Sequence, residues 1–275
     1  MKGSMARSPR IALLLSFLTP GLGQMYNDQM KRGIILYLAG GLIAITLVST
    51  GLFFKFYTML FCLAILAAFF FFVWSDAYTG AVKSKETTLK PYNKWYLYLL
   101  VILITAFVIQ PSFTSIIKNN VVRAYKIPSG GMEPALLVGD YFIADMRLYK
   151  NEKPKRGDVV IFEYPKDPSK DFIKRVIGVE GEKVEINGGR IYINDKEIGD
   201  PWGQVENKDM KTNIQTSDTF GPVRVPNDSV FVLGDNRDNS QDSRHWGFVS
   251  TKQTKGKALY IYWARNKSRI GMQIE

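Results

Sequence analysis

Lys174 is the residue of this sequence whose surroundings best suit a general base. It lies in the apolar segment Phe172–Gly178. In an extended chain alternate side chains share a face, which places Lys174 between Phe172 and Val176. Burial disfavours the charged ammonium and lowers its pKa, and a neutral amine can then take a proton from a nucleophile. The alternative is an edge strand whose lysine extends into solvent.

A short turn, Ile127–Pro134, contains groups that could surround a reacting carbonyl. Two prolines bracket Gly130 and Gly131, so the segment cannot continue a helix and is suited to a fixed turn. Such a turn presents backbone N–H groups outward. The alternative is a tether between a membrane segment and a folded domain.

A second turn-rich segment, Gly234–Arg244, follows the apolar strand Phe231–Leu233. It is too dense in turn-forming residues for a helix. Its aspartates and arginines alternate closely, so Asp–Arg pairs could brace a rigid loop. A solvated turn is the alternative.

The chain has one cysteine, Cys62, and one histidine, His245. Cys62 lies in an apolar run. A single cysteine in that place excludes a disulfide framework, and it excludes a cysteine-ligated zinc site and a thiol nucleophile in residues 118–275. We expect His245 to have a structural or surface role. Proton transfer must then rely mainly on Lys, Asp, Glu or Tyr, and we expect no metal or organic cofactor.

The candidate residues lie in residues 118–275, where short strands alternate with turns. Apolar runs predict strands at 159–162, 172–178, 230–233 and 258–263. Within Val184–Ile193, the pair Asn187-Gly188 is a strong β-hairpin signal. Residues 200–222 are expected to form a long loop. The pattern as a whole predicts a mainly β domain.

Residues 1–117 predict a membrane domain. Three apolar runs are long enough for membrane-spanning helices: 34–50, 52–74 and 95–117. Pro111 is expected to kink or end the third helix. The run Ile11–Leu18 is followed by Thr19-Pro20-Gly21, so we expect it to be interfacial or re-entrant. If it crossed the membrane, there would be four spans and the orientation would invert.

Charge is concentrated beside the apolar runs. Residues 1–117 hold ten Lys/Arg and three acidic residues, a net charge of +7. Residues 118–275 hold 26 Lys/Arg and 22 acidic residues, a net charge of +4. Basic residues lie before the first apolar run and in the connection between the second and third runs. The connection between the first and second runs holds only Lys55. The positive-inside rule places the N-terminus in the cytoplasm and, after three crossings, residues 118–275 outside. The even charge of that second half argues against a nucleic-acid partner.

Four motifs resemble, in order, those of the bacterial type I signal (leader) peptidases. They are Pro-Ser-Gly-X-Met-Glu-Pro at 128–134, Arg-Gly-Asp-Val-Val at 156–160, Lys-Arg-Val-Ile-Gly at 174–178 and Gly-Asp-Asn-Arg-Asp-Asn-Ser-X-Asp-Ser-Arg at 234–244. The resemblance covers about residues 121–265. It implies a membrane-anchored Ser–Lys protease whose catalytic domain is signal-peptidase-like and all-β. Such an enzyme removes signal peptides from exported preproteins at the outer face of the bacterial cytoplasmic membrane. Its implied partners are signal peptides and the lipid bilayer.

The resemblance also implies roles for individual residues. Lys174 matches the general base and Ser129 the hydroxyl that helps form the oxyanion hole. Ser240 matches the hydroxyl that orients the lysine. The family's structural ion pair and the motif positions after the nucleophile are matched by Asp242, Arg244, Met132 and Pro134.

The sequence departs from the family pattern at Gly131, where these enzymes have their nucleophilic serine. Glycine has no side chain to attack a carbonyl, although its N–H could still serve an oxyanion hole. Three explanations remain open. The chain is a catalytically silent relative that binds signal peptides or an export partner, or the residue has been changed in an otherwise working enzyme. In the third, Ser129 attacks through a shifted loop.

Overall fold

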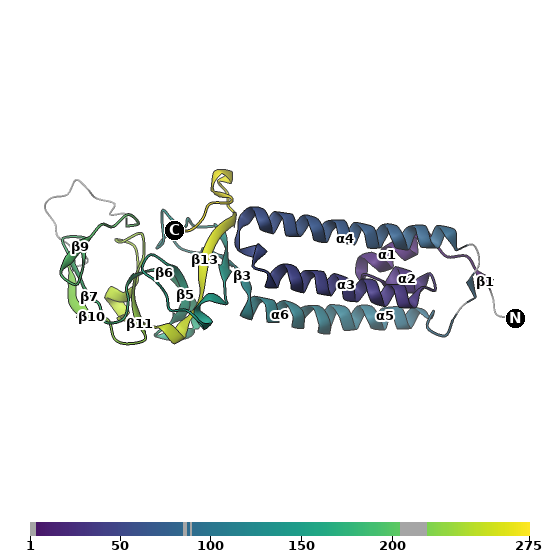
Figure 1. Ribbon diagram of the computed structural model, residues 1–275, viewed down its shortest axis with the longest axis horizontal. Coiled ribbons are helices and arrows are strands. Elements are labelled where there is room, and N and C mark those ends of the chain that lie inside the picture. Colours follow the sequence, from purple (N-terminus) through teal and green to yellow (C-terminus); the bar gives the residue numbers. More distant parts are fainter. Residues whose placement is uncertain (1–3, 85–86, 89, 204–218) are drawn as a thin grey trace. The chain divides into compact units, whose positions relative to one another are not determined.

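The computed structural model describes residues 4–84, 87–88, 90–203 and 219–275. The chain divides into two compact units, Met1–Ile117 and Lys118–Glu275. In its described ranges the first unit is helical, with one short β-pair formed by β1 (Ser4–Met5) and β2 (Thr87–Thr88). The second is mainly β, which confirms the predicted class of that region (Figure 1).

Among the described residues of the first unit, three helices are long and apolar enough to cross a membrane. They are α3 (Met30–Ser49), α4 (Phe56–Lys83) and the continuous helix Trp95–Asn120, which comprises α5 (Trp95–Ile104), the π-helical turn η2 (Thr105–Ile109) and α6 (Gln110–Asn120). Figure 1 shows them side by side.

Two details of these helices differ from the sequence-based expectation. The second begins at Phe56 because Gly51 has a left-handed φ of 76° and Leu52–Phe54 form the 3-10 turn η1. The third continues past Pro111 to Asn120. Pro111 has no N–H to donate to the hydrogen-bond ladder of the helix. The π-helical turn Thr105–Ile109 lies just before that interruption.

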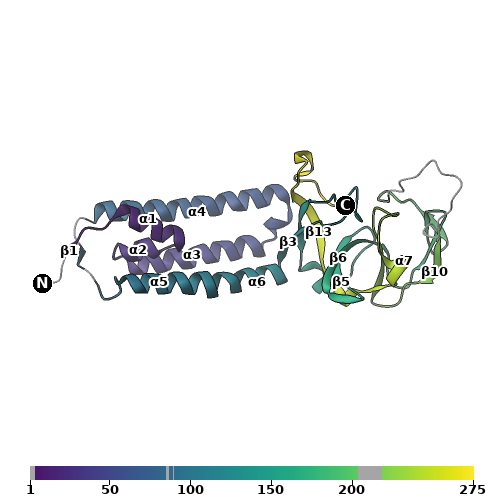
Figure 2. The same cartoon turned by 180° about the vertical axis from the view of Figure 1, so that it is seen from behind.

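A short helical hairpin lies between α3 and α4 (Figure 2). It comprises α1 (Pro9–Leu18) and α2 (Leu22–Tyr26). With ten residues α1 extends only about 15 Å, which is too short to cross a bilayer. The chain reverses at Gly21, whose φ is 90° and where a Cβ would lie 2.1 Å from the Gly33 carbonyl oxygen. Both conditions require glycine at this turn.

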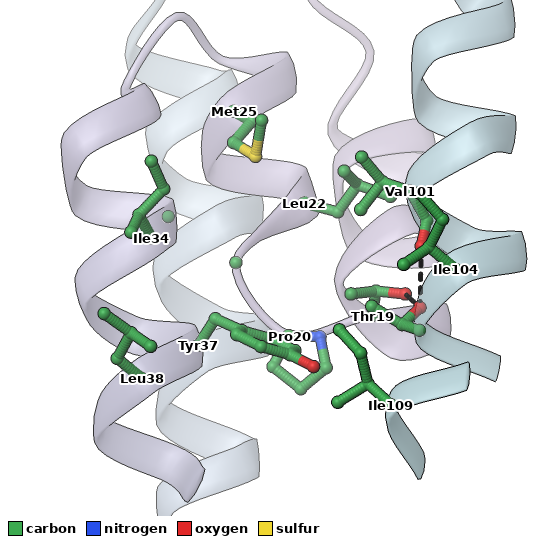
Figure 3. Close-up of a pocket in the computed structure, with 13 residues that line it drawn as sticks. Thr19, Pro20, Leu22, Met25, Ile34, Tyr37, Leu38, Val101, Ile104 and Ile109 are labelled. Carbon is green, nitrogen blue, oxygen red and sulfur yellow. Dashed lines mark hydrogen bonds between the residues drawn. The ribbon is translucent and has the colours of Figure 1, made fainter. Parts of the chain in front are cut away.

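Polar side chains fix this hairpin to the long helices. The buried Gln24 donates through Nε2 to the Val73 carbonyl at 2.8 Å and to Asp76 Oδ2 at 3.1 Å. Thr19 Oγ1 lies 3.1 Å from Thr105 Oγ1, at the edge of an apolar cavity of about 270 Å³ between the hairpin, α3 and α5 (Figure 3). Buried amide and hydroxyl groups need such partners in an apolar environment.

The described residues of the second unit form two antiparallel sheets. The larger has the order β12-β11-β6-β5-β13-β4-β3, and the smaller has the order β10-β7-β8-β9. Their bounds are β3 Val122–Lys126, β4 Tyr141–Asp145, β5 Val159–Tyr164, β6 Asp167–Gly178, β7 Lys183–Asn187, β8 Arg190–Ile193, β9 Lys196–Ile198, β10 Phe220–Arg224, β11 Ser229–Leu233, β12 Val249–Ser250 and β13 Thr254–Trp263. Short helical turns are η3 Leu148–Lys150, α7 Ser243–Trp246, η5 Thr251–Gln253 and η6 Lys267–Arg269.

Two expectations for loops can be compared with these strands. The hairpin at Asn187-Gly188 is present, with β7 and β8 joined by Gly188 and Gly189 at φ values of 58° and 75°. Most of the expected long loop at 200–222 lies outside the described residues. Its described end is wrong as a loop, because β10 begins at Phe220 and pairs with β7.

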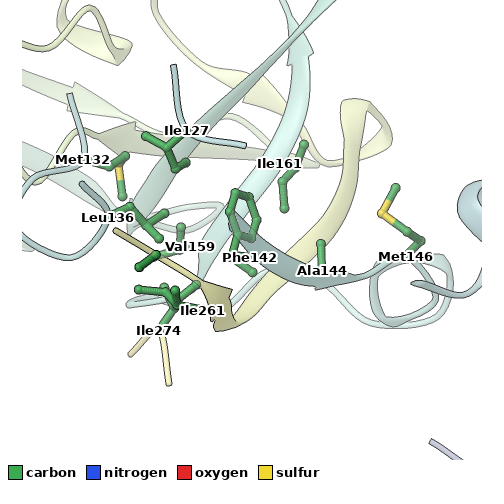
Figure 4. Close-up of a cluster of buried hydrophobic side chains, with 12 residues drawn as sticks. Ile127, Met132, Leu136, Phe142, Ala144, Met146, Val159, Ile161, Ile261 and Ile274 are labelled. Atoms are coloured by element: carbon green, nitrogen blue, oxygen red, sulfur yellow. The ribbon is translucent and has the colours of Figure 1, made fainter. Parts of the chain in front are cut away.

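A hydrophobic core beneath the larger sheet holds the turn Ile127–Pro134 in place. Ile127 and Met132 of the turn, followed by Leu136, are 2%, 1% and 0% exposed. Their side chains join those of Phe142, Val159 and Ile261 (Figure 4). Burial of each such side chain stabilises the fold by about 1.5–3 kcal/mol, so the turn is anchored at both ends.

Candidate active site

Lys174 lies on β6, a central strand of the larger sheet, opposite Val160 of β5. Its side chain is 8% exposed, and no hydrogen bond or ion pair to it is found in the described part of the chain. Burial lowers its pKa below the usual 10.5, against the opposing charges of Asp242 and Asp235. The interpretation of an edge lysine in solvent is therefore wrong, and the amine is suited to accept a proton.

The turn that contains Gly131 is held by backbone hydrogen bonds at both ends. The Ile127 N–H donates to the Asp140 carbonyl at 2.9 Å, and the Leu136 N–H donates to the Met132 carbonyl at 2.8 Å. Asn236 adds a cross-link from the loop after β11. Its backbone N–H donates to the Gly131 carbonyl at 3.4 Å and its Nδ2 to the Gly130 carbonyl at 3.2 Å.

Position 131 faces the lysine amine. A Cβ built on Gly131 would lie 3.3 Å from Lys174 Nζ, 3.5 Å from the Asn239 carbonyl oxygen and 3.8 Å from Ser240 Oγ. A hydroxyl one bond beyond that Cβ would be within hydrogen-bonding reach of the amine. The Gly131 N–H makes no hydrogen bond within the described ranges, which leaves it available to a substrate oxygen.

Ser240 and Gly234 form the opposite side of this site. Ser240 is 7% exposed, and the Gly131, Lys174 and Ser240 groups converge around the same point. A Cβ on Gly234 would lie 2.0 Å from Ser240 Oγ and 2.4 Å from the Gly131 carbonyl oxygen. Glycine at 234 therefore allows the two loops to approach each other.

Asp242 and Arg244 brace the loop that carries Ser240. The fully buried Asp242 accepts from the Gly234 N–H at 3.1 Å and from Arg244 Nε at 2.9 Å. Arg244 Nη2 donates in turn to the Arg237 carbonyl at 2.6 Å. These charge-assisted bonds fix Gly234, and through it the position of Ser240.

A second buried ion pair was not expected from the sequence. Arg175, on the other face of β6 from Lys174, binds Asp235 through Nε at 2.8 Å and Nη2 at 2.7 Å. Arg175 also donates to the Gly157 carbonyl at 2.8 Å. Strand alternation indicated that Arg175 points away from Lys174. Its acidic partner is sixty residues along the chain, and the contact between them depends on the pairing of β6 with β11.

The other predicted residues lie at the edge of this arrangement. Ser129 and Pro134 are exposed, and in the described structure no hydrogen bond joins Ser129 to Lys174. The ring of His245 is 56% exposed, and its Nδ1 accepts weakly from the Asp242 N–H at 3.5 Å at the start of α7. Among the residues with described positions, no three His, Cys, Asp or Glu side chains are arranged to hold a metal.

The fold and site define a mainly β domain in which a buried lysine faces position 131, and comparisons with known proteins identify the family. The family model described as "Signal peptidase, peptidase S26" matches residues 94–263. The chain belongs to this family, and within it to the bacterial type I signal peptidases. The resemblance stated from the four motifs is confirmed.

Individual relatives show the extent of this similarity. A probable signal peptidase I-2 of Synechocystis is 35% identical over 186 residues, which is 66% of this chain and 78% of that protein. The signal peptidase I of Aquifex aeolicus is 34% identical over 200 residues, 54% of this chain and 78% of that protein. A crystal structure of a signal peptidase I from Enterococcus faecalis matches 38% of this chain and 97% of its own chain at 31% identity, with a TM-score of 0.35.

Proposed function

We propose that this protein binds the signal peptides of exported preproteins and that its site supports Ser–Lys hydrolysis when position 131 is serine. The observation that carries the proposal is the 3.3 Å between Lys174 Nζ and a Cβ at position 131. Burial lowers the pKa of the Lys174 amine and so favours its neutral form, which can activate a hydroxyl.

The mechanism of the serine-containing site follows from these positions. Lys174 takes the Oγ proton as Oγ attacks the carbonyl carbon, which forms a tetrahedral intermediate. The N–H of residue 131 and the Ser129 hydroxyl donate to the oxyanion, each such donor contributing about 10²–10³-fold to the rate. The Lys174 ammonium then gives its proton to the leaving amine as the C–N bond breaks. Water hydrolyses the resulting ester with Lys174 again as base.

With Gly131 the bond between a serine Oγ and the substrate carbonyl carbon cannot form. The remaining groups still shape a site around a carbonyl, so the protein with the printed sequence binds signal peptides without cleaving them. The exposure of Ser129 and the burial of Gly131 favour this over attack by Ser129. A displacement of about 1 Å already costs on the order of 10²-fold in rate, and Ser129 is two residues from the required position.

Cleavage of a preprotein in detergent tests the proposal. The full chain is compared with Gly131→Ser and with Gly131→Ala, which adds the Cβ without a hydroxyl. Only the serine variant is expected to cleave. Cleavage by the unaltered chain would show that Ser129 or another group is the nucleophile. Absence of cleavage by Gly131→Ser, with signal-peptide binding also absent, would refute a signal-peptide site.

We propose further that residues 1–117 form a membrane domain with three crossings and that residues 118–275 lie on the outer face of the bacterial cytoplasmic membrane. The support is the three long apolar helices and the basic residues beside them. A cysteine introduced at the exposed position Asp195 should react with a membrane-impermeant maleimide in intact cells that express the chain. Protection of that cysteine until the membrane is opened would show that the orientation is the reverse of the one proposed.

A further inference from the structure

A cationic cavity lies in the second unit, apart from the residues of the peptidase-type site. It has a volume of about 310 Å³. Three cations from different elements line it: Arg123 of β3, Lys150 of η3 and Lys255 of β13. No aspartate or glutamate is among the lining residues described. Such a concentration of positive side chains around one cavity favours an anion.

The carboxylates nearby do not balance these three cations equally. Lys255 lies 2.7 Å from Asp171 and 3.3 Å from Glu163. Arg123 lies 3.9 Å from the same Asp171, at the limit of an ion pair. Lys150 Nζ donates to the neutral Asn120 Oδ1 at 2.8 Å, and no ion pair to Lys150 is found among the described residues. Lys150 and most of the Arg123 charge are thus left for a ligand.

The helix that leads into this unit indicates the source of the anion. Asn119 lines the cavity and lies in the last turn of the candidate span Trp95–Asn120. The cavity is therefore within about one helical turn of the end of an apolar run that is long enough to cross the bilayer. At that depth the anions are the phosphates of lipid headgroups, and Arg123 and Lys150 have the chemistry that binds phosphate oxygens.

We propose that this cavity binds the headgroup phosphate of an anionic phospholipid. Arg123 supplies a planar set of N–H donors and Lys150 a mobile ammonium, while Lys255 stays with its carboxylates. The site rests on the proposed membrane crossing but not on the chemistry at position 131. The bound lipid would hold the start of β3 at the membrane surface.

The test measures lipids retained by the full chain in detergent, by native mass spectrometry, with phosphatidylglycerol and phosphatidylcholine of identical acyl chains. We expect preferential retention of phosphatidylglycerol. The double variant Arg123→Gln/Lys150→Gln should weaken that binding about 30-fold, since each basic residue contributes about fivefold near an anionic surface. The matched control Arg190→Gln/Lys196→Gln removes the same charge from exposed positions of the small sheet and should bind like the unaltered chain.

Three results would overturn the proposal. The first is equal retention of the two lipids. The second is undiminished phosphatidylglycerol binding by the double variant or by Lys150→Gln alone. The third is displacement of the lipid by inorganic phosphate at equal concentration, which would identify a free-phosphate site. Cleavage by Gly131→Ser in lipid-free detergent is measured in parallel, so a failure here is separate from a failure of the peptidase proposal.

Discussion

Gly234 and Gly131 approach each other so closely that a Cβ on Gly234 would lie 2.4 Å from the Gly131 carbonyl oxygen. The same Cβ would lie 2.0 Å from Ser240 Oγ. The absence of a side chain at 234 therefore sets the separation of the two loops that meet at Lys174. The Asn236 bonds to the carbonyls of Gly130 and Gly131 hold that separation.

Gly234→Ala, made together with Gly131→Ser, should reduce cleavage by about 10²-fold or more, because the added methyl must push the two loops apart by about 1 Å. It should also lower the free energy of unfolding by about 1–3 kcal/mol through overpacking. The measurements are preprotein cleavage rates and thermal unfolding in detergent. Gly199→Ala is the control, since nothing lies within 4 Å of a Cβ there. Equal activity of the two alanine variants would contradict the close approach.

Lys174→Met in the Gly131→Ser background should abolish detectable cleavage. Removal of a general base typically costs about 10²–10⁴-fold, and methionine fills the space without a proton acceptor. The fold should persist, because a buried amine without a partner in the described structure is replaced by an apolar group. Lys174→Arg should also be inactive, since guanidinium stays charged. Cleavage retained by either variant would remove the lysine from the mechanism.

Asp242→Asn should destabilise the protein by about 3 kcal/mol, because it removes one charge of the buried pair between Asp242 and Arg244. Arg244 is 9% exposed and Asp242 0%. Asparagine keeps one acceptor oxygen where the carboxylate uses two, for the Gly234 N–H and for Arg244, so cleavage by Gly131→Ser should also fall. Urea unfolding and cleavage are compared with Asp195→Asn, whose carboxylate is 71% exposed and pairs with Lys183. The control should change stability by at most about 0.5 kcal/mol. A similar small change for Asp242→Asn would show that the pair is not a structural brace.

Local patterns were sufficient for much of the fold. An apolar run predicted the 172–178 part of strand β6, and the Asn187-Gly188 pair predicted the β7–β8 hairpin, because both depend on neighbours in sequence. The start of α4 was misplaced, because the hydropathy of Leu52–Phe54 is that of a membrane helix while Gly51 adopts a left-handed conformation. Hydropathy carries no information on such a backbone break.

The site was accessible from the sequence only through its motifs. The apolar neighbours of Lys174 were compatible with burial but left an exposed edge lysine open. The 3.3 Å between its amine and a Cβ at position 131 depends on the pairing of β6 and on the Asn236 cross-link. The Arg175–Asp235 pair was missed for the same reason, since its two residues meet through the pairing of β6 with β11. Spacing along a chain does not determine contacts between distant strands.

The burial of Lys174 also predicts how stability depends on pH. Burial lowers the folded-state pKa of Lys174 below the 10.5 of an exposed lysine. Between these two pKa values the unfolded chain binds more protons than the folded chain, so this group makes the free energy of unfolding rise with pH. Below the folded pKa the cost of burying the ammonium is present in full. It disappears as the pH approaches 10.5.

Lys174→Met should therefore be more stable than the unaltered chain below the folded pKa of Lys174, and the difference should shrink as the pH rises from that pKa toward 10.5. Thermal unfolding of both proteins in the same detergent, over a series of pH values, measures this difference. Other titrating groups are common to the two proteins and cancel. In the Gly131→Ser background the cleavage rate should rise with pH through the same lowered pKa, because neutral amine is the active form. A stability difference that is constant across the series would show that the Lys174 amine titrates normally, and the base would have to be sought elsewhere.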